Sequence, residues 1–254
     1  MANKISLNAA KTELIIFRKP SQLKLPDFKI ILNGKKLFPC HSIKYLGIYL
    51  DEFLSGSAHC AQLKTTLQRA NGMISKARHY LKGDPTTLLS LYHSIFSSHM
   101  LYGCQIWGQT DNKYVKKIQT LQNNSIRLIS FAESFYDHVS HLYKDYKLLK
   151  LRDLITLKNL IFVHDFFNNK LPKSFEGYFS LTRDMHPHAM RNAHHSQVFV
   201  PVPDSVRYGR NSIKLKAILA WNSFAQKFPS ENLLQYSIPK LKSIIVNHFL
   251  ENYN

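Results

Sequence analysis

The side chains best placed for chemistry in this sequence are basic residues that recur at helical spacing. They form two sets, each on the polar side of a predicted helix: Lys64, Arg69, Lys76 and Arg78 in the first, and Lys113, Lys116 and Lys117 in the second. Positive groups along a helix suit the phosphates of a nucleic-acid backbone. A solvated helix surface explains either set equally well.

The charge of the whole chain favours the same kind of partner. Its 254 residues include 34 Lys+Arg and 16 Asp+Glu, which gives a net charge of +18, and the excess is spread along the chain rather than gathered in a tail. RNA or DNA is the polyanion that best offsets such a charge, while an acidic protein or an anionic membrane is the alternative. No membrane span is expected, because histidine, serine and glutamine interrupt the most apolar window, residues 91–107.

Histidine and cysteine residues form small clusters that could supply metal ligands. These are His186, His188, His194 and His195 in one segment, and Cys40-His41 and His59-Cys60 on either side of a predicted strand. No Cys-x-x-Cys pair accompanies them, so loop histidines and buried cysteines are the simpler interpretation and we expect no metal site. Three cysteines, an odd number, argue against a disulfide framework and suit a reducing compartment.

The predicted secondary structure changes near residue 54, from short strands before it to helices after it. Asn33-Gly34 predicts a hairpin between apolar runs at 29–32 and 35–38, and further strands are expected at 13–17 and 43–50. Gly47 suggests a bulge or a close backbone approach in the last strand. A sheet this small needs helices packed against it. The expected fold class is α+β and mostly helical, with a small antiparallel sheet at the N-terminus.

Helical periodicity takes over in the rest of the chain. It predicts helices over residues 59–81, from Asp84-Pro85 to near Gly103, from 110 or 111 to about 129, over about 151–167 and 212–228, and one capped by Ser237. Four prolines lie in residues 168–210, so this part is predicted to be an irregular connection with one short strand at 197–202. The expected units are therefore 1–53, 54–167, 168–210 and 211–254.

Several segments resemble the reverse transcriptases of non-LTR (LINE-type, Jockey-like) retrotransposons. Residues 4–8 (KISLN) with Lys11-Thr12 resemble the segment just after the catalytic aspartates, and 43–48 (IKYLGI) resemble the primer grip. Residues 91–96, 101–108 (LYGCQIWG) and 121–129, with Tyr208-Gly209, Ser212-Ile213 and Trp221-Asn222, resemble the helical region that follows. The resemblance implies a palm remnant, a helical thumb-like domain and C-terminal helices. It also implies that endonuclease, fingers and main palm lie upstream in a longer polyprotein, as partners of this chain.

The resemblance assigns roles to individual residues. Lys11 matches a lysine near the leaving pyrophosphate, although an exposed strand-edge lysine is the interpretation that we prefer. Tyr45, Leu46 and Gly47 match the primer grip, where a small residue lets the backbone approach a primer strand. Ordinary sheet core is the alternative for the first two. A thumb helix lies along the duplex, which gives phosphate contacts to the basic sets described above.

The acidic residues argue against catalysis by the chain itself. Polymerases of this family need palm carboxylates that hold two Mg²⁺ ions. The sequence has no Asp-Asp doublet, and its nearest acidic pair, Asp51-Glu52, suits a solvated strand end. We therefore expect no bound cofactor, no catalytic residues and no enzyme. The predicted function is sequence-tolerant binding of template and primer by a reverse-transcriptase fragment, and the alternative is a non-catalytic helical protein-interaction or scaffold module.

Overall fold

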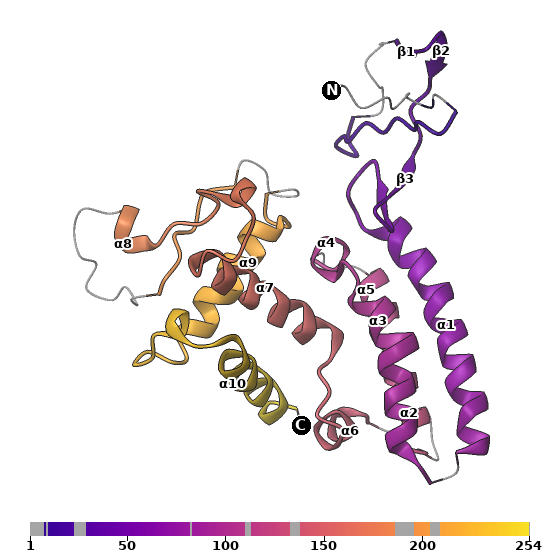
Figure 1. Ribbon diagram of the computed structural model, residues 1–254, viewed down its shortest axis with the longest axis vertical. Helices are drawn as coiled ribbons and strands as arrows, with labels where there is room; N and C mark the ends of the chain where they lie inside the picture. The colour runs from indigo at the N-terminus through magenta and orange to yellow at the C-terminus, as the bar shows by residue number, and fades with distance from the viewer. Residues whose placement is uncertain are drawn as a thin grey trace, which may run out of the picture.

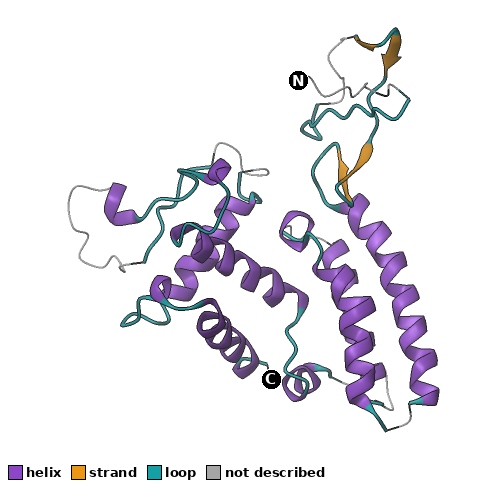
Figure 2. Cartoon of the chain, viewed as in Figure 1, coloured by secondary structure: helices purple, strands orange, loops and turns teal. Residues whose placement is uncertain are grey.

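A computed structural model describes residues 8, 10–22, 29–81, 83–109, 113–132, 138–185, 196–203 and 209–253 (Figure 1). The fold is α+β and mostly helical, with two small antiparallel sheets near the N-terminus (Figure 2). This confirms the fold class that the sequence predicts. Across the described ranges, every helix is too short or too polar to span a bilayer.

Both sheets are two-stranded hairpins. Strands β1 (Ile30–Leu32) and β2 (Lys35–Leu37) are joined by Asn33 and Gly34, whose φ angles of 46° and 76° suit the predicted turn. Strands β3 (Ser42–Tyr45) and β4 (Ile48–Asp51) pair across Leu46 and Gly47. The single strand predicted over 43–50 is therefore wrong. The strand predicted over 13–17 is reduced to one bridge between Leu14 and Pro39.

A first group of helices follows the hairpins. It consists of α1 (Ser57–Tyr80), α2 (Pro85–Leu91), the π-helical η1 (Tyr92–Ser97), α3 (Ser98–Leu101), α4 (Cys104–Trp107), α5 (Lys113–Ile129) and α6 (Ser140–Asp145). The start of α2 is as predicted, because the Asp84 carboxylate accepts a 3.0 Å hydrogen bond from the Thr87 amide and Pro85 occupies the first turn. Leu67, Ile74 and Ile118 lie in the core of this group, fully buried.

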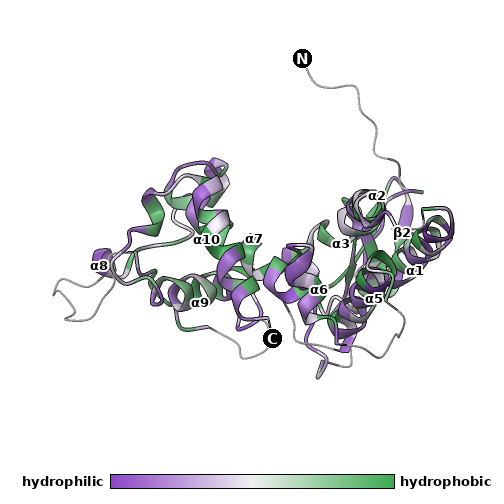
Figure 3. Ribbon diagram, turned by 90° about the horizontal axis from the view of Figure 1, so that it is seen from below, coloured by the Kyte–Doolittle hydropathy of each residue, from purple (hydrophilic) through white to green (hydrophobic). Residues whose placement is uncertain are grey.

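A second group of helices closes the chain. It consists of α7 (Leu151–Phe167), η2 (Lys173–Phe175), α8 (Thr182–Met185), α9 (Ile213–Ala225), η3 (Leu233–Gln235) and α10 (Ile238–Glu251). Figure 3 shows this group beside the first, with α6 between them. Helix α7 serves both cores, because Leu151 and Ile155 pack in the first and Leu160 and Val163 in the second.

The segment before α9 is held by side chains of that helix. The Asn222 amide bonds to both the amide and the carbonyl of Val198, at 2.9 and 2.8 Å, and the Trp221 indole donates to the Ser196 carbonyl at 2.8 Å. The short strand predicted over 197–202 is only a bridge between Leu181 and Val198. Two backbone hydrogen bonds flank this bridge, from the Thr182 amide to the Gln197 carbonyl at 2.9 Å and from the Phe199 amide to the Ser180 carbonyl at 2.8 Å, so backbone and side-chain groups together satisfy this segment.

Candidate nucleic-acid interface

Helices α1 and α5 lie side by side, and polar contacts fix their register. The Asn71 amide donates a 3.0 Å hydrogen bond to the Leu121 carbonyl, and the Ser125 hydroxyl donates to the Asn71 carboxamide oxygen. Buried polar groups that are paired in this way stabilise one arrangement over its neighbours. The contacts therefore determine which residues of the two helices flank the surface between them.

That surface contains a groove of about 300 Å³. It is lined by Cys60, Ala61, Lys64, Thr65 and Gln68 of α1 and by Tyr114 and Lys117 of α5. One basic residue from each predicted set, Lys64 and Lys117, thus lines the same groove, and both are exposed. None of the lining side chains is acidic. Sequence reasoning missed Thr65, Gln68 and Tyr114, because only packing of the two helices brings them beside the lysines.

The other basic residues of α1 lie elsewhere on the helix. Arg69 and Lys76 are exposed and seven residues apart, so they share one side, roughly 120–140° around the helix from Lys64. Arg78 is half-buried and already engaged. Its guanidinium donates to the Ala132 carbonyl at 3.4 Å and lies 5.1 Å from the centre of the Phe131 ring. The four residues therefore do not form one face.

The other two lysines of the second predicted set lie in the first turn of α5. Lys113 and Lys116 are exposed, and the Lys113 ammonium lies 5.5 Å from the centre of the Tyr114 ring. A cation near an aromatic face is weakly held at the surface. Both side chains thus remain available to solvent beside the groove.

Tyr45, Leu46 and Gly47 form the tip of the β3–β4 hairpin. Tyr45 and Leu46 are 61% and 74% exposed, so the alternative that they are sheet core is wrong. The Tyr102 hydroxyl donates a 2.6 Å hydrogen bond to the Leu46 carbonyl, and a Cβ at Gly47 would lie 3.1 Å from Tyr102 Cε1. The close approach suggested at Gly47 is present, and the approaching group is an aromatic ring that sequence reasoning gave no role.

The hairpin and the groove lie at the same end of α1. The hairpin leads directly into the N-terminus of α1 (Figure 1), and the groove is lined by residues 60–68 of that helix. A Cβ at Gly103 would lie 2.3 Å from Ile48 Cδ1. A larger residue at this position would have to displace the Ile48 side chain and adopt the φ of 58° that glycine adopts without strain.

Lys11 lies apart from both features. It is exposed in a turn in which its amide donates to the Asn8 carbonyl at 3.1 Å, and the Thr12 hydroxyl donates to the same oxygen at 2.9 Å. Leu14, which follows this turn, forms a bridge with Pro39, just after β2, so the turn lies near the β1–β2 hairpin.

The acidic pair after β4 has a structural role. The buried Asp51 carboxylate accepts hydrogen bonds from the Phe53 and Ser55 amides at 3.1 and 2.9 Å. Glu52 pairs with the Arg18 guanidinium at 2.7 Å and with His41 at 2.9 Å, and these hydrogen bonds hold the pKa of the Glu52 carboxyl below its usual value. A solvated strand end is therefore the wrong interpretation. Both carboxylates thus stabilise the backbone and side chains at the end of β4.

Of the cysteine and histidine residues near the hairpins, His59, Cys60 and Cys104 are buried, whereas Cys40 is half-buried and His41 is exposed. Burial raises the pKa of Cys60 to about 12 and that of Cys104 to about 11. His59 is buried, with its ring 5.5 Å from that of Trp107. Over the ranges that the structure describes, no three His, Cys, Asp or Glu residues are close enough together to hold a metal ion. The cluster from His186 to His195 lies outside the described residues.

Comparison with known proteins identifies the chain's relatives. No protein-family model and no solved structure matches it. A probable RNA-directed DNA polymerase from transposon X-element of Drosophila melanogaster is 29% identical over 157 residues, which cover 59% of this chain and 16% of that protein. The RNA-directed DNA polymerase from mobile element jockey of the same species is 30% identical over 128 residues, or 49% of this chain and 14% of that protein. The chain is a relative of non-LTR retrotransposon polymerases.

The extent of the match matters for what these polymerases say about the chain. The jockey polymerase of Drosophila funebris is 28% identical over 155 residues, covering 59% of this chain and 16% of that protein. The chain thus spans about a sixth of the length of these retrotransposon polymerases. The match assigns no activity to these 254 residues by themselves.

The prediction that the chain is no enzyme needs correction. All four matching relatives are named RNA-directed DNA polymerases. The prediction rested on a missing acidic doublet within one stretch of sequence. Catalytic centres are assembled from residues far apart in a chain, so the residues of a stretch that matches 14–16% of each polymerase cannot exclude an enzyme.

Proposed function

We propose that this chain is the part of a retrotransposon RNA-directed DNA polymerase that binds the backbone of the template–primer duplex. The observation that carries the proposal is the groove in which Lys64 of α1 and Lys117 of α5 lie together. Two cations presented from separate helices suit the phosphates of one strand, and no lining carboxylate opposes them. Binding through phosphates is tolerant of sequence.

The polar side chains between these lysines suit the same ligand. Thr65 and Gln68 also line the groove, and hydroxyl and amide groups commonly donate to phosphate oxygens. Arg69 and Lys76, on another side of α1, add long-range attraction rather than direct contact. Lys113 and Lys116 extend the positive surface beside the groove, and Arg78 supports the end of α1.

The tip of the β3–β4 hairpin is the proposed contact for the primer strand. Tyr45 and Leu46 are exposed there, and the hydrogen bond from Tyr102 holds the turn. An exposed aromatic ring beside a fixed turn can support a sugar or a base. The tip and the groove lie at one end of α1, so one duplex can reach both.

We also propose that the β1–β2 hairpin packs against the remainder of the polymerase palm. Ile31 and Phe38 are 54% and 70% exposed. A hairpin of two strands is marginally stable by itself and needs further strands or helices. Lys11, in the neighbouring turn, belongs with this surface rather than with the groove.

Matched charge variants test the duplex-binding proposal. We expect the double substitution Lys64→Gln and Lys117→Gln to weaken binding to a labelled RNA–DNA duplex at least about tenfold, because one well-formed hydrogen bond to a charged group contributes about 1.5–3 kcal/mol and about 1.4 kcal/mol corresponds to a tenfold change in affinity. The control, Arg69→Gln with Lys76→Gln, removes the same charge from another side of α1 and should change affinity much less. Equal losses would show that net charge, and not the groove, controls binding. Pull-down of a protein partner that resists nuclease would favour the scaffold function instead.

A further inference from the structure

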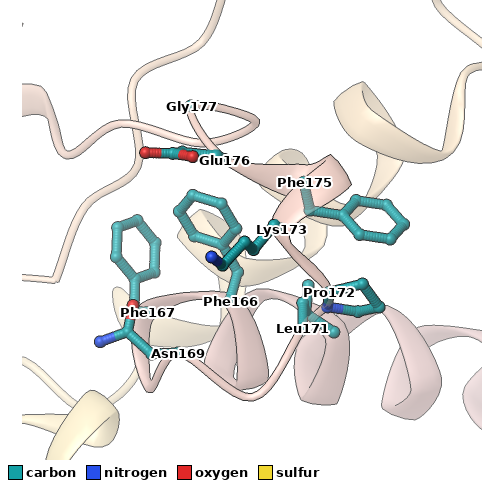
Figure 4. A pocket seen from close by; sticks show the side chains of 9 residues that line it. All are labelled: Phe166, Phe167, Asn169, Leu171, Pro172, Lys173, Phe175, Glu176 and Gly177. Atoms are coloured by element: carbon teal, nitrogen blue, oxygen red, sulfur yellow. The ribbon is translucent and has the colours of Figure 1, made fainter.

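A second pocket lies at the C-terminal end of α7, outside the groove (Figure 4). Its volume is about 540 Å³, within the range of small-molecule sites. The lining residues that matter here are Phe166, Phe167, Asn169, Lys173, Phe175 and Glu176. Helix α7 has 17 residues and is about 25 Å long, and its other end packs in the first core, so this pocket is remote from α1 and α5.

The end of α7 explains why the pocket forms. The Asn169 amide bonds to the Phe166 carbonyl at 3.0 Å and the Lys170 amide to the Asp165 carbonyl at 2.9 Å, the pattern of a Schellman motif. Asn169 has a φ of 55°, a left-handed conformation that asparagine tolerates. The chain then passes Pro172 into η2, which places Phe175 among the lining residues, with its ring against Phe162 of α7.

The aromatic rings that line the pocket are held in place by contacts with one another and with neighbouring rings. The Phe166 ring lies 5.1 Å from those of Phe167 and Phe179, at interplanar angles of 89° and 87°. The Phe175 ring lies 5.5 Å from that of Phe162 at 80°. Edge-to-face contacts of this kind hold the rings before any ligand arrives, which lowers the entropic cost of binding.

Three polar side chains at the rim are available to a ligand. Asn169, Lys173 and Glu176 are exposed, and within the described part of the chain their side chains form no hydrogen bond or ion pair. In Figure 4 the Lys173 side chain extends from η2 toward Phe166 and Phe167. The pocket thus combines aromatic surfaces with an ammonium, a carboxamide and a carboxylate.

We propose that this pocket receives an unpaired nucleobase of single-stranded RNA or DNA. A nucleobase is a planar ring with donors and acceptors on its edge, which matches aromatic walls with an amide and a carboxylate at the rim. Lys173 would contact the adjoining phosphate, and the charge of +18 attracts the strand. Both sites are proposed to bind nucleic acid, but the pocket and the duplex groove have no residue in common. The pocket proposal and the groove proposal can therefore fail independently.

Single-stranded and duplex probes distinguish the two sites in the full chain. Phe175→Leu keeps apolar volume and removes an aromatic face, and should weaken binding of a single-stranded oligothymidine or oligouridine roughly 5- to 100-fold. The same substitution should leave duplex binding unchanged. Lys173→Gln should flatten the salt dependence of single-strand binding by about 0.7 in the log–log slope. Lys64→Gln with Lys117→Gln should weaken duplex binding while leaving the effect of Phe175→Leu intact.

Several results would overturn the proposal. One is an unchanged single-strand affinity in a natively folded Phe175→Leu chain, as expected if the pocket takes a protein side chain instead. Equal loss on single-stranded and duplex probes is another. If Phe175→Leu fails to fold, Lys173→Gln and an abasic oligonucleotide replace it in the test. An abasic strand that binds as tightly as the intact strand would exclude insertion of a base into the pocket. A 5-iodouridine crosslink that maps to residues 166–177 supports the site, and crosslinks found only elsewhere exclude it.

Discussion

The Tyr102 hydroxyl donates a 2.6 Å hydrogen bond to the Leu46 carbonyl and so joins the tip of the β3–β4 hairpin to the end of α3. The same ring lies against Gly47. Residues 43–48 and 101–108, two of the segments that resemble reverse-transcriptase motifs, are therefore in contact. One side chain of the helical part holds the turn that is proposed to meet the primer.

Removal of this hydrogen bond should loosen the hairpin. Tyr102→Phe is expected to lower the free energy of unfolding by about 0.5–1.5 kcal/mol, toward the lower end because the residue is 55% exposed. Urea unfolding measures the change. Tyr80→Phe is the control, because Tyr80 is 89% exposed. A loss no larger than that of the control would mean that the hydrogen bond contributes nothing.

Two alanine variants can distinguish the effect of the close contact with Tyr102 at Gly47 from the effect of its left-handed backbone conformation. Gly47 and Gly83 have φ angles of 82° and 79°, but an added Cβ meets Tyr102 only at Gly47, and nothing within 4 Å at Gly83. Both alanine variants should lose about 1–2 kcal/mol from the left-handed conformation. Gly47→Ala should lose more, as measured by the same urea titration. Equal losses at the two positions would contradict the contact.

Local signals in the sequence predicted the main helices well. Asp84-Pro85 marks the start of α2, and the limits of α7 agree with the predicted range of residues 151–167. A capping carboxylate and an apolar stripe act within a few residues, so they can be recognised without the fold. The Asn33-Gly34 turn is recognisable for the same reason.

Features that depend on tertiary contact could not be predicted in this way. Leu46 adopts a φ of 46°, which a non-glycine residue rarely does, so the run at 43–50 looked like one strand. Short helices such as α4 and α6 carry too few turns for a periodic pattern. The sequence identified the basic residues of the candidate site but did not show which of them lie together. Lys64 and Lys117 line the same groove only because α1 and α5 pack side by side.

Thiol reactivity should separate the three cysteines. Cys40 is partly exposed, whereas Cys60 and Cys104 are buried with raised pKa values of about 12 and 11. At about pH 8 the native chain should react with a disulfide reagent at one thiol only, and Cys40→Ser should abolish that reaction. Three reactive thiols are expected in concentrated guanidinium chloride. Rapid reaction of a second thiol in the native chain would contradict the burial of the helical core.

The stability of the chain should fall in mild acid. Burial lowers the pKa of His59 below 6.5, so below pH 6.5 the unfolded chain binds a proton that the folded chain still excludes. The free energy of unfolding is therefore highest above pH 6.5 and falls as the pH drops toward the folded pKa, by at most about 1.4 kcal/mol per pH unit for this group. His59→Gln should flatten this dependence, and the exposed His99→Gln should not. Parallel curves for all three chains would exclude a role for His59.

The salt dependence of duplex binding tests the central proposal most directly. If Lys64 and Lys117 each contact a phosphate, the slope of log K against log salt on duplex DNA should become shallower by about 1.8 when both are replaced by glutamine, at about 0.9 per phosphate. Arg69→Gln with Lys76→Gln should leave the slope nearly unchanged. Equal slopes for the groove variant and the unaltered chain, or binding that does not respond to salt, would contradict the proposed interface.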